Sequence, residues 1–261
     1  MNIRNIAIIA HVDHGKTTLV DQLIKKSGTL EAHEELAERA MDSNALERER
    51  GITILAKNTA IHYKDYKINI MDTPGHADFG GEVERIMHMV DGVLLVVDAY
   101  EGTMPQTRFV LKKALAAHVK PIVVINKVDR PVVRIQEVMD EVLELFMELG
   151  ADDNQLDFPT VFVSALNGTS SLDPDISTQV PNMDCLFDMI INEIPAPTVE
   201  REGGFQMLVT SLQYDTFQGK YAIGRVARGI AKRGMAVALL KNGEIAGSAR
   251  IEKVFGYRGL N

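Results

Sequence analysis

A loop suited to phosphate binding follows the first apolar run of the chain. Residues 10–17 read AHVDHGKT and stand between a β-branched run and an amphipathic run. In such a strand–loop–helix, backbone N–H groups face the phosphates, the lysine reaches the outer phosphates and the threonine hydroxyl binds Mg²⁺. Ala10 replaces the usual first glycine, so a chance Gly-Lys-Thr loop is the alternative for this segment alone. We predict phosphate binding by Asp13, His14, Gly15, Lys16, Thr17 and Thr18, with Thr17 also a Mg²⁺ ligand.

A second motif, DTPGH at residues 72–76, follows another β-branched run. An acid at the end of a strand can hold Mg²⁺ through water, and a nearby glycine N–H can bind the terminal phosphate. Asp72 and Gly75 are the residues expected in these two roles. Taken alone, the motif could equally be an ordinary turn.

Two further motifs could select the base of a nucleotide. In NKVD, residues 126–129, the Asp129 carboxylate can accept from N1–H and from the exocyclic amine of guanine, and adenine has no matching pair of donors. The tripeptide at 164–166 can supply a backbone N–H to the guanine oxygen, although it is a weak motif by itself. Four motifs in this order, each expected at the carboxyl end of a strand, make coincidence negligible. The predicted ligands are GTP and GDP, and the predicted base-site residues are Asn126, Lys127, Asp129, Ser164, Ala165 and Leu166.

The elements that must position these motifs alternate between short β-branched runs and longer amphipathic runs over the first 195 residues. This alternation predicts an α/β fold with a parallel sheet and helices on both faces, and such folds bind phosphates beyond the carboxyl ends of the strands. The expected strands are 3–10, 67–71, 92–98, 121–125 and 160–164. The expected helices are 16–26, 81–89, 107–117 and 135–149.

A second domain is expected after the proline-rich linker at residues 195–197. Short strands are predicted at 206–213, 221–227, 236–240 and 250–255, with a hairpin signal at 241–244. We therefore expect a GTP-binding domain over residues 1–198 and an all-β domain, a partial barrel, over residues 199–261. The second part is short for a complete barrel, which suggests that it is truncated.

Composition is that of a soluble globular protein, with 46% apolar and 25% charged residues. The single cysteine, Cys185, cannot form an internal disulfide, and no apolar run approaches the length of a membrane helix. A cytoplasmic location without membrane association is expected.

Charge is distributed unevenly along the chain. Residues 204–261 contain nine lysines and arginines and three acids, a net charge of +6, and since the whole chain carries −8, residues 1–203 carry −14. The basic part could face phosphate groups of a nucleic acid, or it could be an ordinary solvated surface.

The sequence ERERGITI at residues 47–54 closely resembles the first switch of translational GTPases, and the DTPGH form of the second switch is similar to theirs. More narrowly, residues 10–14, 41–44, 55–60 and 164–168 resemble the BipA/TypA family. The resemblance covers essentially the whole chain.

This resemblance implies roles for residues that spacing alone does not assign. Thr53 is the implied second Mg²⁺ hydroxyl ligand, and His76 is the implied catalytic residue that positions the attacking water. Val12 and Ile52 match the apolar pair that keeps such a histidine from the water until a partner triggers it. Asp13 stands where related GTPases can bind a monovalent cation, although a solvated acid or a turn hydrogen bond is an equal alternative.

The resemblance further implies a monomeric, ribosome-associated GTPase that contacts rRNA and acts as a conformational switch in ribosome assembly or translation. One alternative is a nucleotide-gated binding module whose hydrolysis is negligible in this length of chain. Another is an ATP-dependent P-loop enzyme such as a kinase.

Overall fold

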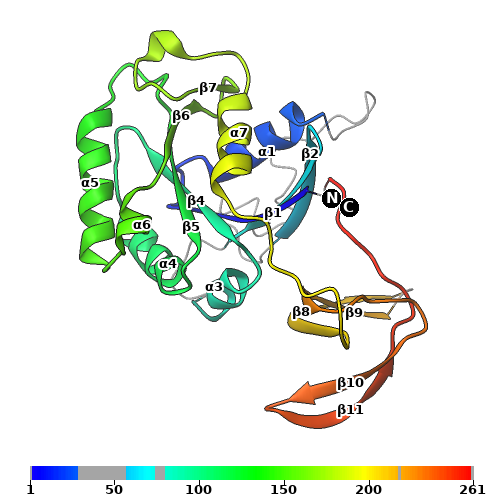
Figure 1. Cartoon of the computed structure of the whole chain (residues 1–261). Helices are drawn as coiled ribbons and strands as arrows, with labels where there is room; N and C mark the ends of the chain where they lie inside the picture. Colours follow the sequence, from blue (N-terminus) through cyan, green and yellow to red (C-terminus); the bar gives the residue numbers. More distant parts are fainter. Residues whose placement is uncertain (1, 29–56, 74–79, 217–218, 260–261) are drawn as a thin grey trace. The chain divides into compact units, whose positions relative to one another are not determined.

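A mostly parallel sheet forms the centre of the first of two units. The computed structural model describes residues 2–28, 57–73, 80–216 and 219–259 (Figure 1). The chain forms two compact units, residues 1–196 with 257–261 and residues 197–256. Seven strands of the first unit lie in the order β2-β3-β1-β4-β5-β6-β7. Their bounds are β1 Asn2–Ala10, β2 Lys57–Tyr63, β3 Tyr66–Asp72, β4 Gly92–Asp98, β5 Lys120–Asn126, β6 Thr160–Ser164 and β7 Thr169–Ser171.

The five inner strands run parallel, and each edge strand is antiparallel to its neighbour. The central strand β4, GVLLVVD, is buried at every residue, as expected for a strand that is covered on both faces. The carboxyl ends of β1, β3, β4, β5 and β6 therefore meet at one edge of the sheet. This edge is where all four sequence motifs begin.

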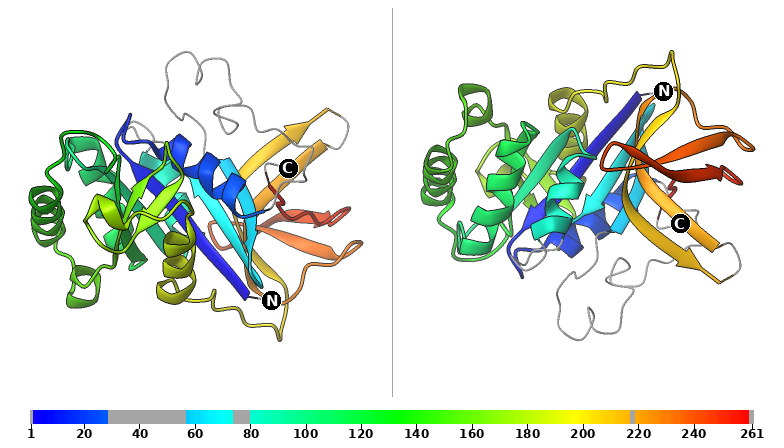
Figure 2. Two further views of the ribbon diagram at one scale, coloured as in Figure 1. Left: turned by 90° about the horizontal axis from the view of Figure 1, so that it is seen from above. Right: turned by 90° about the horizontal axis from the view of Figure 1, so that it is seen from below.

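Helices cover both faces of the sheet (Figures 1 and 2). Ala7 and Ile9 of β1 pack in one apolar cluster with α3, α4 and α5, whereas Ile6 and Ile8 pack in the other with α1 and α7. This period of two is what a strand buried on both faces requires. The helices are α1 Lys16–Lys26, α3 Gly80–Met87, α4 Pro105–Ala116, α5 Ile135–Glu148, α6 Asp153–Leu156 and α7 Asp184–Glu193, with a short 3₁₀ helix at Ile176–Thr178.

The predicted α/β class is confirmed, and each strand and helix predicted for the first unit is present within about two residues of its expected bounds. The prediction missed both edge strands, β2 and β7, and the helices α6 and α7. The strands that form the two edges of the sheet were therefore not predicted from the sequence.

The edge strand β2 has a partner from the end of the described chain. Ala60 and Gly259 exchange two backbone hydrogen bonds, with N···O distances of 3.2 and 2.7 Å. The Asn58 side chain donates to the Tyr257 hydroxyl at 3.2 Å, and the Thr59 hydroxyl donates to the Gly259 carbonyl. These contacts satisfy backbone groups that an edge strand would otherwise expose.

The second unit contains two antiparallel hairpins. β8 Gln206–Asp215 pairs with β9 Gly219–Arg228, and β10 Ala236–Lys241 pairs with β11 Glu244–Arg250. The predicted turn at 241–244 is confirmed, and Asn242 and Gly243 have the positive φ that such a turn needs. The barrel itself and the boundary at residue 198 stay predictions.

The strand predicted at 250–255 is wrong, because the strand that follows the hairpin turn is Glu244–Arg250. Arg250 pairs with Ala236, the first residue of β10, and beyond it Ile251 exchanges backbone hydrogen bonds with Gly234 and Met235. This strand is hard to recognise in the sequence EIAGSAR, since glycine and alanine are poor strand formers. The turn geometry determined the pairing instead.

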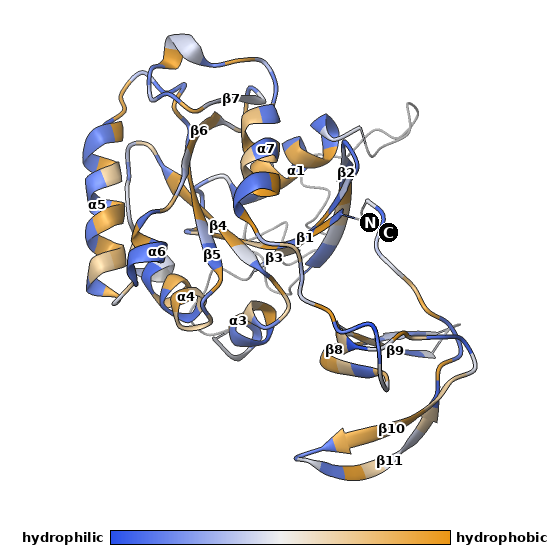
Figure 3. Cartoon of the chain, viewed as in Figure 1, coloured by the Kyte–Doolittle hydropathy of each residue, from blue (hydrophilic) through white to orange (hydrophobic). Residues whose placement is uncertain are grey.

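Apolar residues concentrate along the central strands of the first unit (Figure 3). Among the residues that the structure describes, no helix is long and apolar enough to cross a membrane.

Candidate functional site

The phosphate loop joins the end of β1 to the start of α1, as the motif predicts. Gly15, the residue before α1, has φ +90°, a conformation that glycine adopts at little cost. A Cβ atom at Gly15 would lie 2.3 Å from the Asn126 Nδ2 atom. The loop therefore needs glycine both for its backbone angle and for the close approach of Asn126.

Lys16 reaches from this loop to the end of β3. Its Nζ atom lies 2.8 Å from Asp72 Oδ1 and donates a hydrogen bond to the Thr73 carbonyl. The Asp72 side chain is fully buried. Thr17 is half-buried on the first turn of α1, and Thr18 is exposed. The structure thus brings the predicted phosphate lysine next to the predicted metal carboxylate.

The oxygen ligands at this edge fit Mg²⁺. The ion prefers hard oxygen ligands, and it is usually held by one or two carboxylates together with substrate phosphates. Asp72 and the Thr17 hydroxyl provide such oxygens. Within the described ranges, no cluster of three or more His, Cys, Asp or Glu residues suits a metal held by protein groups alone.

Asn126 connects three of the four motifs. Its Nδ2 atom donates to the His14 carbonyl at 2.8 Å, and its Oδ1 atom accepts from the Ala165 N–H at 3.0 Å. The side chain is almost completely buried, so these bonds are shielded from water. Asn126 fixes the phosphate loop, the end of β5 and the loop after β6 relative to one another.

Lys127 and Asp129 lie on the loop that follows β5. Lys127 has φ +64°, which is uncommon for a residue with a side chain, and its Nζ atom donates to the Asp13 carbonyl. Asp129 is half-buried. Next to this loop, Ser164 Oγ accepts from the Asn167 N–H at 3.2 Å, and the Leu166 side chain is exposed. The predicted base-site residues therefore come from two adjacent loops.

His14 belongs to the phosphate loop, and its side chain is fully buried. Its Nδ1 atom accepts from the Asp98 N–H at 3.4 Å, and its Nε2 atom lies 3.3 Å from Glu101 Oε2. Burial, with a contribution from His11, lowers the pKa of His14 below its ordinary value, and the nearby Asp98 and Glu101 carboxylates only partly oppose this. His14 is therefore neutral at pH 7, and its side chain links the loop to the end of β4.

The sequence reasoning missed Asp98 as a member of this site. Its buried carboxylate lies 2.7 Å from Lys127 Nζ and 3.1 Å from an Arg130 nitrogen. The signal was present in the sequence, because Asp98 ends a predicted strand and Asp72 directly follows one. Asp98 was not predicted as a site residue because it belongs to none of the four motifs.

Four predicted residues lie outside the described part of the chain: Ile52, Thr53, Gly75 and His76. Their roles stay predictions from the motifs and the resemblance. Val12 is described and half-buried in the phosphate loop, and Asp13 is exposed with φ +65°. The monovalent cation near Asp13 also stays a prediction.

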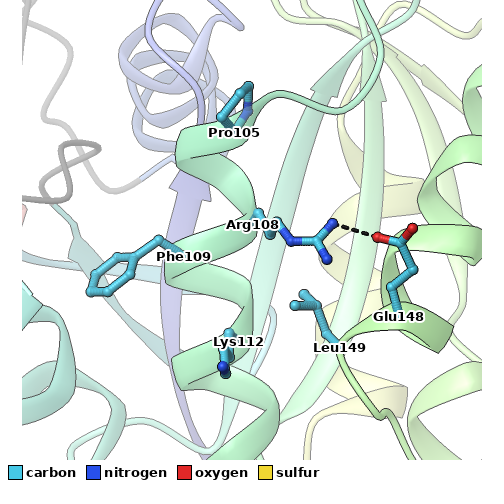
Figure 4. Close-up of a pocket in the computed structure, with 6 residues that line it drawn as sticks. All are labelled: Pro105, Arg108, Phe109, Lys112, Glu148 and Leu149. Atoms are coloured by element: carbon cyan, nitrogen blue, oxygen red, sulfur yellow. Dashed lines mark hydrogen bonds and ion pairs between the residues drawn. The ribbon is translucent and has the colours of Figure 1, made fainter.

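A pocket of about 380 Å³ lies between α4 and α5 and shares no residue with this site (Figure 4). Arg108 and Glu148 form an ion pair in it, and Phe109 points away from that pair. None of the six lining residues belongs to the four motifs. The predicted nucleotide-binding residues therefore do not line this pocket.

Comparison with known proteins agrees with this geometry. Residues 1–196 match the family model described as the elongation factor Tu GTP binding domain. The chain is 62% identical over 259 residues to the large ribosomal subunit assembly factor BipA of Bacillus subtilis, which covers 99% of this chain and 42% of that protein. It is 57% identical to the protein of the same name in Escherichia coli K12 over 258 residues, covering 99% of this chain and 42% of that protein. The chain thus spans about two fifths of the length of these relatives.

The identities confirm the predicted resemblance to the BipA/TypA proteins. The match to the family model includes all four motifs and the whole seven-stranded sheet. The chain belongs to the family of the elongation factor Tu GTP-binding domain.

Proposed function

We propose that this chain binds GTP and hydrolyses it to GDP and phosphate, and that hydrolysis resets a conformational switch. The observation that carries this proposal is the pair of Asn126 side-chain hydrogen bonds, one donated to the His14 carbonyl and one accepted from the Ala165 N–H. They hold the phosphate loop and both base-site loops at one edge of the sheet. This arrangement supports simultaneous contact with the phosphates and the base of one nucleotide.

In this proposal, the loop N–H groups and Lys16 bind the phosphates, and Asp129 selects guanine. Thr17, Thr53 and Asp72 would hold Mg²⁺, which when bound neutralises charge on the phosphate oxygens. Binding of GTP requires Lys16 to exchange part of its contact with Asp72 for the phosphates. Mg²⁺ next to Asp72 would keep a cation beside this buried carboxylate while Lys16 contacts the phosphates.

His76 is proposed to position the attacking water, a role that rests on its place after Asp72 and Gly75 and on the family resemblance. We also propose that Val12 and Ile52 keep His76 from the water until a partner releases it. The water then attacks the terminal phosphate, and the bond to the GDP oxygen breaks.

The partner is proposed to be the ribosome, because the similar proteins in Bacillus subtilis and Escherichia coli are named large ribosomal subunit assembly factors. Residues 199–261, proposed as part of a β-barrel domain, carry the basic side chains for an rRNA contact. Within residues 199–256, eight of these are exposed: Arg201, Lys220, Arg228, Lys232, Arg233, Lys241, Arg250 and Lys253. A monomer in the cytoplasm is the proposed state.

The test compares GTP turnover by the parent chain and His76→Ala, with and without ribosomes. Removing the residue that positions the water is expected to lower stimulated turnover by about 10²–10⁴-fold and to leave GDP affinity unchanged. His88→Ala, at an exposed histidine after α3, is the matched control and should behave as the parent. Equal stimulated turnover by His76→Ala and the parent would reject the catalytic assignment.

Ribosomes that fail to accelerate the parent chain would support the alternative of a binding module without significant hydrolysis. The nucleotide site would then remain, and the residues needed for activation would have to lie beyond these 261.

A further inference from the structure

Asp98 is a buried carboxylate at the carboxyl end of β4, next to the base-site loop. It pairs in register with Asn126 at the end of β5, and its side chain has no exposure to solvent. Lys127 Nζ lies 2.7 Å from Oδ2, and the N–H groups of Tyr100 and Glu101 donate to Oδ1 at 2.8 and 3.2 Å. Both carboxylate oxygens are therefore held in fixed directions.

The partner of this carboxylate is the residue with the unusual backbone. Lys127 has positive φ, and a non-glycine residue keeps such a conformation only where its surroundings enforce it. Its ammonium group contacts Asp98 on one side and donates to the Asp13 carbonyl of the phosphate loop on the other. The Lys127 side chain thus bridges the base-site loop and the phosphate loop, and Asp98 is the charge that holds it there.

The ionic state of Asp98 fits this role. Burial acts to raise the pKa of the carboxyl group, but the bonds from Lys127 and from the two backbone N–H groups outweigh it and place the pKa below its ordinary value. Asp98 is therefore charged at neutral pH. A buried charge of this kind is stable only while it is paired, so the pairing with Lys127 is strongly favoured.

We propose that Asp98 is a positioning residue for guanine-nucleotide binding, which acts by holding Lys127 between the base-site loop and the phosphate loop. The inference rests on the proposed guanine-nucleotide site and adds a residue from β4, a strand that none of the four motifs includes. Among the predicted site residues, the Asp98 side chain contacts Lys127, while the Asp98 N–H donates to His14 Nδ1. A substitution of the side chain keeps that backbone bond, so the effect of the carboxylate on the nucleotide passes through Lys127.

Arg130 supplies the matched control, because it contacts the same carboxylate from the exposed side at 3.1 Å. If Asp98 served only to neutralise Arg130 or to stabilise the fold, the Lys127 contact would be incidental. Arg130→Gln leaves the Lys127 pair in place, and it is expected to change GDP affinity by less than about twofold.

A double-mutant cycle on the 261-residue chain tests the coupling. GDP affinity is measured for the parent, Asp98→Asn, Lys127→Met and the double variant, with GTP turnover measured in parallel. Neutralising Asp98 is expected to weaken GDP binding about tenfold when Lys127 is present and less than about twofold when it is Met. An equal loss in both backgrounds, or no loss, would overturn the proposal.

The kinetic constants separate positioning from damage to the fold. Asp98→Asn is expected to raise KM for GTP about tenfold with kcat within about twofold, as for a loss of uniform binding. A variant that is merely partly unfolded would lower kcat and leave KM unchanged, and this result would also overturn the proposal. If Asp98→Asn does not fold, Asp98→Glu replaces it in the same cycle, since the added methylene displaces the carboxylate while the charge is kept.

Failure of the proposed function would look different. In that case the parent chain itself would not bind GDP, or would bind ATP equally well, whatever residue stands at position 98.

Discussion

At the scale of single residues, the site depends on polar side chains that each satisfy two partners. Asn126 binds the phosphate loop and the loop after β6, and Lys127 contacts Asp98 and the Asp13 carbonyl. Such shared contacts make the parts of the site interdependent, because the loss of one side chain removes a contact to two of them at once.

Asp129→Asn tests the choice of base. The amide keeps the size of the side chain but replaces one acceptor oxygen with a donor, which faces the guanine donors unfavourably. GDP affinity is expected to fall about ten- to a hundredfold, with ATP affinity unchanged. Competition binding measures both, and an undiminished GDP affinity would rule out the assignment of Asp129.

His14 predicts a pH dependence of stability. Its pKa is lowered in the folded protein, so the unfolded chain binds more protons as the pH falls through the ordinary value of 6.5, and the folded state loses stability. Thermal unfolding should therefore show a lower Tm at about pH 5.5 than at about pH 7.5, with part of the drop due to His14.

His14→Asn keeps an acceptor near the Asp98 N–H but cannot be protonated, so its drop in Tm should be smaller than that of the parent. His88→Asn makes the same change at an exposed histidine and should leave the drop unaltered. An equal drop in the parent and in His14→Asn would contradict the burial of a neutral histidine.

At the scale of elements, the central strands were predictable and the edges were not. The run GVLLVVD has the continuous apolar pattern of a strand that is buried on both faces. By contrast, β2 begins with the polar residues Lys57, Asn58 and Thr59, and its place is determined by pairing with β3 and Gly259. The sequence of α7, DCLFDMIINE, contains weak helix formers, and burial against the sheet overrides their propensity.

The same limit applied to the candidate site. Its motif residues were predictable because each stands at the end of a strand in a loop of known chemistry. The contacts among them depend on the spatial order of β1, β3, β4, β5 and β6, which differs from their order in the sequence. The pairing of Asp98 with Lys127 therefore required the structure.

Phe187→Ala tests how much α7 contributes to the first unit. Phe187 is fully buried and stacks on Tyr63 of β2, with ring centroids 4.4 Å apart. Its loss is expected to reduce the free energy of unfolding by about 3–5 kcal/mol, measured by urea denaturation without nucleotide. Leu172→Ala, at an exposed leucine, should change it by less than about 0.5 kcal/mol, and a similar effect of the two variants would contradict the packing of α7.

At the scale of the whole molecule, the chain combines an acidic first unit with a basic second unit. Every described residue of the predicted nucleotide site belongs to the first unit, and the exposed basic side chains named above belong to the second. This separation is consistent with a switch in which one unit hydrolyses nucleotide while the other contacts an anionic partner.

The central claim is that the first unit selects guanine nucleotides, and competition binding tests it most directly. Labelled GDP would be bound to the 261-residue chain in the presence of Mg²⁺ and displaced with unlabelled GDP, GTP or ATP. We predict displacement by GDP and GTP, with ATP at least about 10²-fold weaker, because adenine lacks the pair of donors that Asp129 accepts. Equal displacement by ATP and GTP would contradict the account.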